Sequence, residues 1–277
     1  MNGSYFNNKT VWITGASSGI GEALAYEFSR HGARPVLSAI DDAALAAVAG
    51  HCREAGAPAT FTEAFDIGDH DRLPEIASRV LDRTGGIDIL VNNAGIGQRA
   101  SALDCGNETV RRITDVNFLG PVFLTGSVLP SMIARVSGRI VVIASVLGRY
   151  HLPGRSAYAA SKHALIGYFS TLRTELRNSG VAVSIIMPGW ITTNMSLNAL
   201  TADGSTYNRT TRPPSRRMSA GTCARQIIKA LAAGKTEVSI GGIETWGGIL
   251  RLLFPRFFDR LISRRQGEFI FHRRHDA

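Results

Sequence analysis

The stretch VWITGASSGIGEALAYEF, residues 11–28, joins an apolar run to a helical pattern through a glycine-rich turn. Glycines stand at positions 15, 19 and 21. Where a helix begins directly after a strand, its first N–H groups can bind phosphate, and side chains at such positions would obstruct the approach. The position of the glycines at the first strand-to-helix turn therefore predicts a dinucleotide-binding turn.

Short apolar runs alternate with helical patterns as far as residue 187. The runs are continuously apolar, as expected for strands of a parallel sheet that is covered on both faces. This alternation predicts a single-domain, Rossmann-type doubly wound α/β fold with a parallel sheet. The predicted strands are 10–14, 35–39, 59–65, 87–91, 138–145 and 181–187, and the predicted helices include 21–31, 42–55 and 71–83.

The alternation breaks after residue 187. Residues 190–218 are polar and turn-rich, and a structureless stretch of this length is usually a functional lid or a disordered segment. A helix at 220–234 and a short strand at 237–240 then resume the fold. We therefore expect a dinucleotide-binding catalytic domain at residues 1–244, with a lid near 190–218, and an amphipathic basic extension at residues 245–277.

The composition limits which class of protein this chain can belong to. A chain of 277 residues with 44% hydrophobic and 19% charged residues can form a soluble globular domain. No apolar run approaches the ~20 residues that span a membrane, and the N-terminus lacks the pattern of a signal peptide. Cys52, Cys105 and Cys223 lie far apart without metal-ligand spacing, so we expect reduced thiols, no metal site and a cytoplasmic protein.

The net charge of +9 lies entirely in the last quarter of the chain. Residues 205–277 hold 14 Lys/Arg against 5 Asp/Glu, whereas residues 1–204 hold 17 of each. A basic segment can be a solvated face, or it can contact phosphates of nucleic acid or lipid. No nucleic-acid recognition motif accompanies the charge, so we expect no nucleic-acid partner.

The stretch SAYAASKHAL, residues 156–165, places Tyr158 and Lys162 on one face of a helix. Alone, the pair would suit a partly buried helix whose polar tips reach water. After a dinucleotide turn it gains a chemical meaning, because an ammonium one helical turn away favours the phenolate. A phenol stabilised in this way can act as a general acid or base near neutral pH.

With TGxxxGxG at 14–21, NNAG at 92–95 and YAASK at 158–162, the chain resembles the short-chain dehydrogenase/reductase family over roughly residues 9–240. The resemblance implies hydride transfer between NAD(P)(H) and a small-molecule carbonyl or secondary alcohol, and we expect a homodimer or homotetramer. The alternative is a catalytically silent dinucleotide-binding sensor on the same fold.

The resemblance also implies a catalytic tetrad. Tyr158 would exchange the proton, and Ser145 would hydrogen-bond the substrate oxygen. Lys162 would hold the ribose hydroxyls, and Asn117 would anchor a water relay to Lys162. Asp66 and the N–H of Ile67 would hold the adenine, and Thr192, in PGWITT at 188–193, would contact the nicotinamide amide. The implied cofactor-binding residues are Gly15, Ser17, Ser18, Gly19, Ile20, Gly21, Ile40, Asp41, Asp66, Ile67, Asn93, Ala94, Gly95, Tyr158, Lys162, Pro188, Gly189, Ile191 and Thr192.

The end of the second predicted strand bears on the choice of cofactor. In VLSAIDD, residues 36–42, Ala39 stands where an acidic residue usually binds the ribose, and Ile40 stands where an arginine usually binds the 2′-phosphate. Asp41 would oppose a phosphate, which favours NAD(H) over NADP(H). Asp41 and Asp42 can equally cap and start a helix.

The stretch WGGILRLLFPRFFDRLISRR, residues 246–265, interleaves eight large apolar residues between Leu250 and Ile262 with five arginines. Pro255 is expected to divide it into two helical pieces. The segment can pack as a flap over the substrate cleft or against a dimer partner, or it can lie on a membrane surface. A similar tail occurs in the branch of the family that acts on lipophilic carbonyls such as steroids and retinoids. A lipophilic substrate and peripheral membrane contact are therefore expected.

Overall fold

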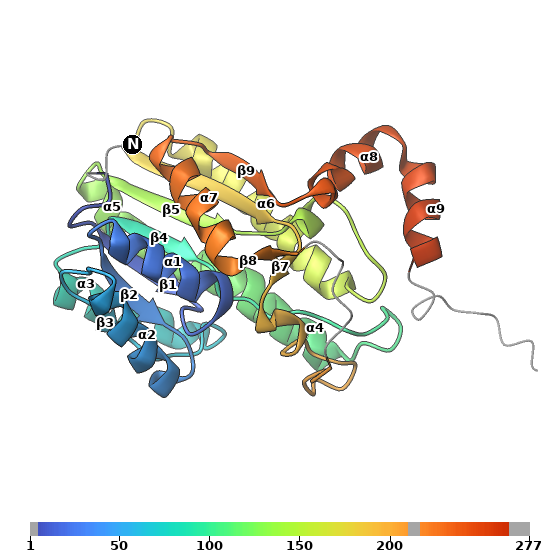
Figure 1. Cartoon of the computed structure of the whole chain (residues 1–277), viewed down its shortest axis with the longest axis horizontal. Coiled ribbons are helices and arrows are strands. Elements are labelled where there is room, and N and C mark those ends of the chain that lie inside the picture. The colour runs from blue at the N-terminus through green and yellow to red at the C-terminus, as the bar shows by residue number, and fades with distance from the viewer. Residues whose placement is uncertain (1–4, 210–216, 266–277) are drawn as a thin grey trace, which may run out of the picture.

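The main sheet of the computed structural model is parallel throughout, and the model describes residues 5–209 and 217–265 (Figure 1). Its strands are β1 (Thr10–Thr14), β2 (Arg34–Ser38), β3 (Phe61–Thr62), β4 (Ile89–Asn92), β5 (Gly138–Ile143), β6 (Val181–Pro188) and β9 (Glu237–Ile240). They are ordered β3-β2-β1-β4-β5-β6-β9. The order reverses direction between β1 and β4, and in such sheets ligands bind outside the carboxyl ends of the strands at this point.

Helices cover both faces of the sheet. One face carries α1 (Gly19–Arg30), α2 (Asp42–Glu54) and α7 (Ala220–Ala232). The other carries α3 (Leu73–Thr84), α4 (Asn107–Thr114), α5 (Gly120–Ala134) and α6 (Ser156–Glu175). The doubly wound fold predicted from the sequence is therefore confirmed.

Each central strand contributes to two apolar cores, because successive side chains point to opposite faces. In β1, Trp12 packs into the core beneath α3, α5 and α6, while Val11 and Ile13 pack into the core beneath α1, α2 and α7. Both layers exclude water, so both sets of positions must be apolar. This requirement explains why the strands read as continuous apolar runs.

The third strand is shorter than the sequence predicts. The prediction covers residues 59–65, but β3 comprises only Phe61–Thr62. The chain continues along β2 as irregular backbone, with the N–H groups of Glu63 and Phe65 donating to the carbonyls of Leu37 and Ala39. As an edge strand, β3 pairs on one side only, so fewer ladder bonds enforce regular geometry.

One continuous helix differs from the expectation that no segment could span a membrane. A π-helical turn, η2 (Asp115–Leu119), joins α4 to α5, and the resulting helix Asn107–Ala134 has 28 residues. Its length and apolar composition would allow it to cross a membrane. However, 44% of its most apolar 18-residue stretch is buried inside the protein. In the structure it lies beside α3 and α6 over one face of the sheet.

The segment predicted as a lid has local structure. A short strand, β7 (Ile191–Thr192), pairs in parallel with β8 (Met218–Ser219). Between them lies a 3₁₀ turn, η4 (Asn194–Ser196), and Leu200 forms isolated bridges with Gln98 and Thr206. Part of the predicted lid, residues 210–216, lies outside the described residues.

The chain ends in two helices that project from the body of the molecule (Figure 1). They are α8 (Gly247–Leu253) and α9 (Pro255–Arg265), with Pro255 at the start of the second. The predicted division of this segment at the proline is confirmed. The remaining short turns are η1 (His70–Arg72), η3 (Val146–Gly148) and η5 (Ile243–Trp246).

Candidate active site

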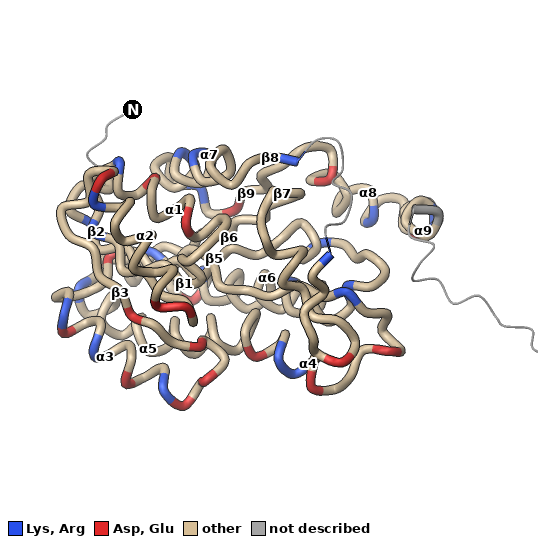
Figure 2. The backbone as a smooth tube through the Cα atoms, turned by 60° about the horizontal axis from the view of Figure 1, so that its bottom comes forward, with Lys and Arg blue, Asp and Glu red and all other residues tan. Residues whose placement is uncertain are grey.

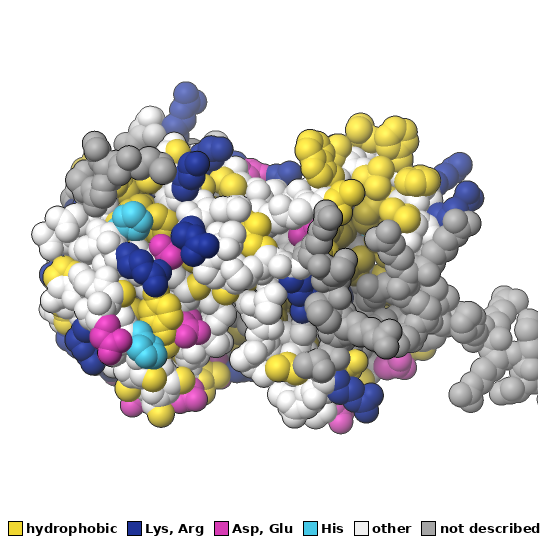
Figure 3. Space-filling view, viewed as in Figure 1, with side chains coloured by type: hydrophobic (Ala, Val, Ile, Leu, Met, Phe, Trp, Pro, Cys, Tyr) yellow, Lys and Arg dark blue, Asp and Glu magenta, His cyan; other side chains and the backbone are white. Residues whose placement is uncertain are grey.

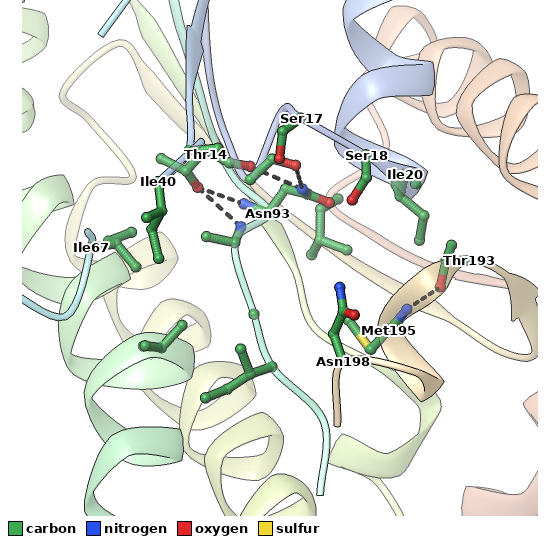
Figure 4. Close-up of a pocket in the computed structure, with 18 of the residues that line it drawn as sticks. Thr14, Ser17, Ser18, Ile20, Ile40, Ile67, Asn93, Thr193, Met195 and Asn198 are labelled. Atoms are coloured by element: carbon green, nitrogen blue, oxygen red, sulfur yellow. Dashed lines mark hydrogen bonds between the residues drawn. The ribbon is translucent and has the colours of Figure 1, made fainter. Parts of the chain in front are cut away.

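A cavity of about 360 Å³ lies at the carboxyl ends of the central strands. Its walls come from the turn after β1, the ends of β2, β4, β5 and β6, the helix α6 and the segment after β7 (Figure 4). These elements meet where the strand order reverses, which is the expected ligand position in an open α/β sheet.

The turn after β1 needs glycine for two separate reasons. Gly15 and Gly19 have φ values of +63° and +62°, a region that other residues rarely adopt. At Gly21 the reason is space, because a Cβ there would lie 2.2 Å from the carbonyl oxygen of Gly15. Within the described chain, the Ser18 side chain forms no capping hydrogen bond at the start of α1. The first N–H groups of α1 therefore fit a phosphate ligand.

Asn93 and Thr14 hold this turn against the end of β4 (Figure 4). The Thr14 hydroxyl accepts hydrogen bonds from the N–H groups of Asn93 and Ala94, at 3.0 and 3.1 Å. In return the Asn93 amide donates to the carbonyls of Thr14 and Gly15, at 2.9 and 3.1 Å. The NNAG motif thus fixes the position of the glycine turn.

Tyr158 and Lys162 lie one turn apart on α6, and both are buried. The Lys162 ammonium donates to the carbonyl of Ile143 at 3.0 Å and stands 5.8 Å from the centroid of the Tyr158 ring. The N–H of Tyr158 donates to Gln98 Oε1 at 3.2 Å, which positions the first turn of α6. Ser145 follows β5, and its hydroxyl accepts from the N–H of Leu147 at 3.1 Å.

Asn117 is buried in the π-helical turn and does not line the cavity. Its Oδ1 accepts from the N–H of Ile96 at 2.8 Å, and its Nδ2 donates to the carbonyl of Ile96 at 3.0 Å. A Cβ on Gly95 would lie 3.3 Å from Asn117 Oδ1 and 3.5 Å from Lys162 Nζ. Asn117 therefore lies behind Gly95, close to the lysine.

Burial and charge shift the pKa values of this pair. Burial raises the pKa of Tyr158, while a hydrogen bond with Ser145 and the positive charge of Arg155 both oppose that rise. Burial lowers the pKa of Lys162 to about 8. At neutral pH, then, the phenol is protonated beside a cation, as a proton donor requires.

The adenosine end of the cavity contains Ile40, Asp41 and Asp66. Asp41 caps α2, because its Oδ1 accepts from the N–H of Ala44 at 3.0 Å, and it also lines the cavity. Asp66 accepts from the N–H of Gly68 at 2.8 Å and pairs with Arg112 at 2.6 Å. Arg112, which also borders the cavity, lies in α4 and carries no motif.

Most residues that the sequence predicts for the site line this one cavity, and three do not. Asn117 and Gly21 lie behind its wall, where they support neighbouring backbone. Thr192 also does not line it, whereas Thr193 does. Successive side chains of an extended segment point to opposite sides, and Thr192 lines a second pocket that adjoins the start of α1. Its contact with the nicotinamide amide stays a prediction. Met195 and Asn198 line the cavity as well, and no sequence motif identifies them.

No group of three His, Cys, Asp or Glu side chains able to hold a metal ion occurs within residues 5–209 and 217–265. The chemically distinctive groups of the cavity are instead a buried phenol, a buried ammonium and a hydroxyl, next to a turn built for a diphosphate. These donors fit a dinucleotide and an oxygen-bearing substrate.

Comparisons with known proteins extend this description. Residues 9–203 match the family model for short chain dehydrogenase. The chain is 39% identical over 264 residues to "Dehydrogenase/reductase SDR family member 7B" of Danio rerio, with 93% of this chain and 85% of the relative covered.

Two solved structures show the same fold with a nucleotide bound. One is a short chain dehydrogenase/reductase from Burkholderia phymatum in complex with NAD, with a TM-score of 0.78, 26% identity and 93% and 96% of the two chains covered. The other is a metagenomic short-chain oxidoreductase in complex with NADP, with a TM-score of 0.71, 29% identity and coverage of 84% and 97%.

Proposed function

Because this chain belongs to the short-chain dehydrogenase/reductase family, we propose that it transfers a hydride reversibly between NAD(P)(H) and a carbonyl or secondary alcohol. The observation that carries the proposal is the buried pair Tyr158 and Lys162, with Ser145 beside it, in the same cavity as the glycine turn. A buried phenol next to an ammonium has no evident structural purpose in an apolar layer, since each polar group costs free energy on burial.

The chain's own residues handle the proton and the orientation of the substrate. When bound, the nicotinamide cofactor supplies or accepts the hydride. In reduction, the Tyr158 phenol donates a proton to the substrate oxygen, which Ser145 holds by a hydrogen bond. The Lys162 ammonium favours the phenolate that remains. In oxidation, the phenolate removes the proton of the alcohol.

The test combines nucleotide binding with turnover. NADH and NADPH are titrated by fluorescence, and reduction of a panel of ketones is followed by absorbance. Tyr158→Phe should keep nucleotide affinity and lower kcat by about a hundredfold or more, the usual contribution of a general acid. Tyr168→Phe, an exposed position on the same helix, is the matched control and should retain kcat.

The same experiment separates the enzyme from the silent alternative. A sensor would bind nucleotide and reduce no ketone, and Tyr158→Phe would then change nothing. If the Phe variant reduces ketones at the rate of the wild type, the assignment of Tyr158 is wrong.

We further propose NAD(H) as the preferred cofactor. The support is the Asp41 carboxylate at the adenosine end of the cavity, which would repel a 2′-phosphate. A homodimer or homotetramer is proposed for the assembly, supported by exposed apolar side chains on α5 and α6, among them Phe123 and Tyr168. Light scattering at several concentrations tests the assembly.

We also propose a cytoplasmic protein that contacts anionic membranes peripherally and takes a lipophilic substrate. Figure 3 shows apolar side chains gathered on the C-terminal helices, where Trp246 is 65% and Leu252 79% exposed. Figure 2 shows Lys or Arg on α7, α8 and α9. Each basic residue near an anionic surface contributes about 1 kcal/mol to attachment.

The C-terminal helices also pack on the body of the protein. Phe258 is 2% exposed and belongs to one apolar cluster with Tyr150 and Tyr158. The Nε2 atom of His151 lies 3.3 Å from Oδ1 of Asp259 on α9. Packing therefore engages one side of these helices, and the proposed membrane contact uses the other.

Liposome co-sedimentation tests the membrane contact. Binding should require anionic lipid, weaken with salt and fall when Leu252 and Leu253 are both replaced by Ser. Val136→Ser, at an exposed apolar position remote from the tail, should leave binding unchanged. If the wild type stays in the supernatant at low salt, the helices serve only as a flap.

A further inference from the structure

Three arginines from separate parts of the chain meet beside the candidate catalytic tyrosine. Arg99 follows β4, Arg155 immediately precedes α6 and Arg217 immediately precedes β8. Burial, with the positive charges of Arg99 and Arg217, lowers the pKa of Arg155 to about 10. The guanidinium groups of Arg99 and Arg217 are therefore each close enough to repel that of Arg155.

The Arg155 guanidinium lies close to Gly97. A Cβ on Gly97 would lie 3.4 Å from Arg155 Nη1 and 3.3 Å from the carbonyl oxygen of Met195. The sulfur of Met195 is in turn 3.9 Å from the Tyr158 hydroxyl. The guanidinium and Met195 therefore both lie against Gly97, and Arg155 stands only three residues before Tyr158 on the chain.

The described residues place no carboxylate where it acts on Arg155. Apart from burial, the groups that shift its pKa are two guanidiniums and the phenols of Tyr158 and Tyr207, and no described carboxylate is among them. Arg99 lies over the Tyr207 ring, 5.5 Å from its centroid. The Nε of Arg217 is buried without a hydrogen-bond partner in the described chain.

A guanidinium that is largely removed from water, as that of Arg155 is, costs free energy unless an anion joins it. A guanidinium matches the two oxygens of a carboxylate or phosphate through paired N–H groups. The glycine turn and the start of α1 already fit the cofactor diphosphate, and Arg155 adjoins the lid beside Tyr158. The ligand that best explains the arginines is therefore part of the substrate.

We infer that Arg99, Arg155 and Arg217 bind an anionic group, a carboxylate or a phosphate, carried by the carbonyl substrate. This inference rests on the proposed reductase function and narrows its substrate class. Bound in this way, the anionic group lies on the lid side of Tyr158, and the carbonyl of the same molecule reaches the phenol. Together with the proposed lipophilic preference, it describes an amphiphilic anionic ketone or alcohol.

The test measures a preference ratio in matched substrate pairs. Oxo-carboxylic acids of several chain lengths are compared with their methyl esters, and phosphate esters of hydroxyketones with the free hydroxyketones. The ratio is needed because Arg155 also favours the Tyr158 phenolate, so its loss slows both members of a pair. In the wild type, kcat/KM for the anionic member should exceed that for the neutral member at least tenfold.

Arg155→Gln and Arg217→Gln should each lower this ratio about tenfold to a hundredfold, as expected for a lost hydrogen bond to a charged group. Arg155→Lys keeps the charge but not the paired N–H groups, and should give an intermediate ratio. Arg177→Gln, at an exposed position beyond α6, removes the same charge elsewhere and should leave the ratio intact. The acid and phosphate series show which anion the site prefers.

A binding measurement keeps this inference separate from the proposed function. Calorimetric titration with inorganic phosphate and with acetate should show binding to the wild type that Arg155→Gln weakens tenfold or more. Anion binding that depends on Arg155 without reduction of any ketone would refute the reductase function and leave the anion site standing. Equal anion binding by the wild type and Arg155→Gln, or a preference ratio that survives in Arg155→Gln, would overturn the inference.

Discussion

Replacing Lys162 by Met should stabilise the protein in the absence of nucleotide while abolishing its proposed activity. Lys162 is 2% exposed, and burial lowers its pKa from 10.5 to about 8. A lowered pKa means that the folded state disfavours the protonated lysine relative to the unfolded chain. Methionine has a similar length and carries no charge, so it removes this cost.

The shift in pKa sets the size and the pH range of the effect. Below pH 8 both states are protonated, and the wild type bears the full cost of about 3 kcal/mol. Between pH 8 and 10.5 the unfolded chain keeps a proton that the folded protein has lost, so wild-type stability rises with pH by up to about 1.4 kcal/mol per unit. The hydrogen bond to the Ile143 carbonyl, worth about 1 kcal/mol, is lost in the variant at every pH.

The net result is a stability advantage for Lys162→Met of about 2 kcal/mol at pH 7, which falls close to zero by pH 9.5. Urea unfolding of both proteins at half-unit steps of pH, without nucleotide, measures this difference. Lys229→Met on α7, at an exposed position, is the control, and its difference from the wild type should not change with pH. A constant difference for Lys162→Met, or a destabilisation that grows towards neutral pH, would refute the reasoning.

Three further changes test other parts of the site. Asp41→Asn should keep the cap of α2 and raise the affinity for NADPH relative to NADH several-fold, measured by fluorescence titration; an unchanged ratio would mean that Asp41 acts only as a cap. Gly189→Ala should lower the free energy of unfolding, measured in urea, by about 1–3 kcal/mol. The new Cβ would lie 2.2 Å from Glu244 Oε1, which accepts hydrogen bonds from the N–H groups of Trp190 and Gly242. Phe258→Ala should cost about 3 kcal/mol locally and expose α9 to proteolysis; equal cleavage rates in the variant and the wild type would contradict the packing described for it.

The sequence predicted those parts of the fold that depend on local or two-sided burial. Strands such as β1 and β6 are apolar at most positions on both faces because helices cover both sides of the sheet, so the runs alone identified them. The length of β3 depends on how much of an edge strand finds a partner, which composition does not encode. The continuity of α4 with α5 through a π-helical turn likewise depends on packing against α3 and α6.

The candidate site shows a similar division. Gly15, Asn93, Tyr158 and Lys162 occur in short motifs, because the chemistry proposed for them, cofactor binding and proton transfer, is the same for many substrates. Met195 lines the cavity, and Arg155 and Arg217 belong to the proposed anion site. These residues come from distant segments and follow no spacing rule. Only the folded chain brings them together.

The position of Phe258 links the rim of the molecule to its reactive centre. Because Phe258 shares an apolar cluster with Tyr150 and Tyr158, any bilayer, detergent or protein that pulls α9 outward also loosens the wall behind the phenol. Turnover then responds to the surroundings of the C-terminal helices. A detergent used to keep the protein in solution would act as a modulator of its kinetics, and rates measured with and without it would belong to two differently packed enzymes.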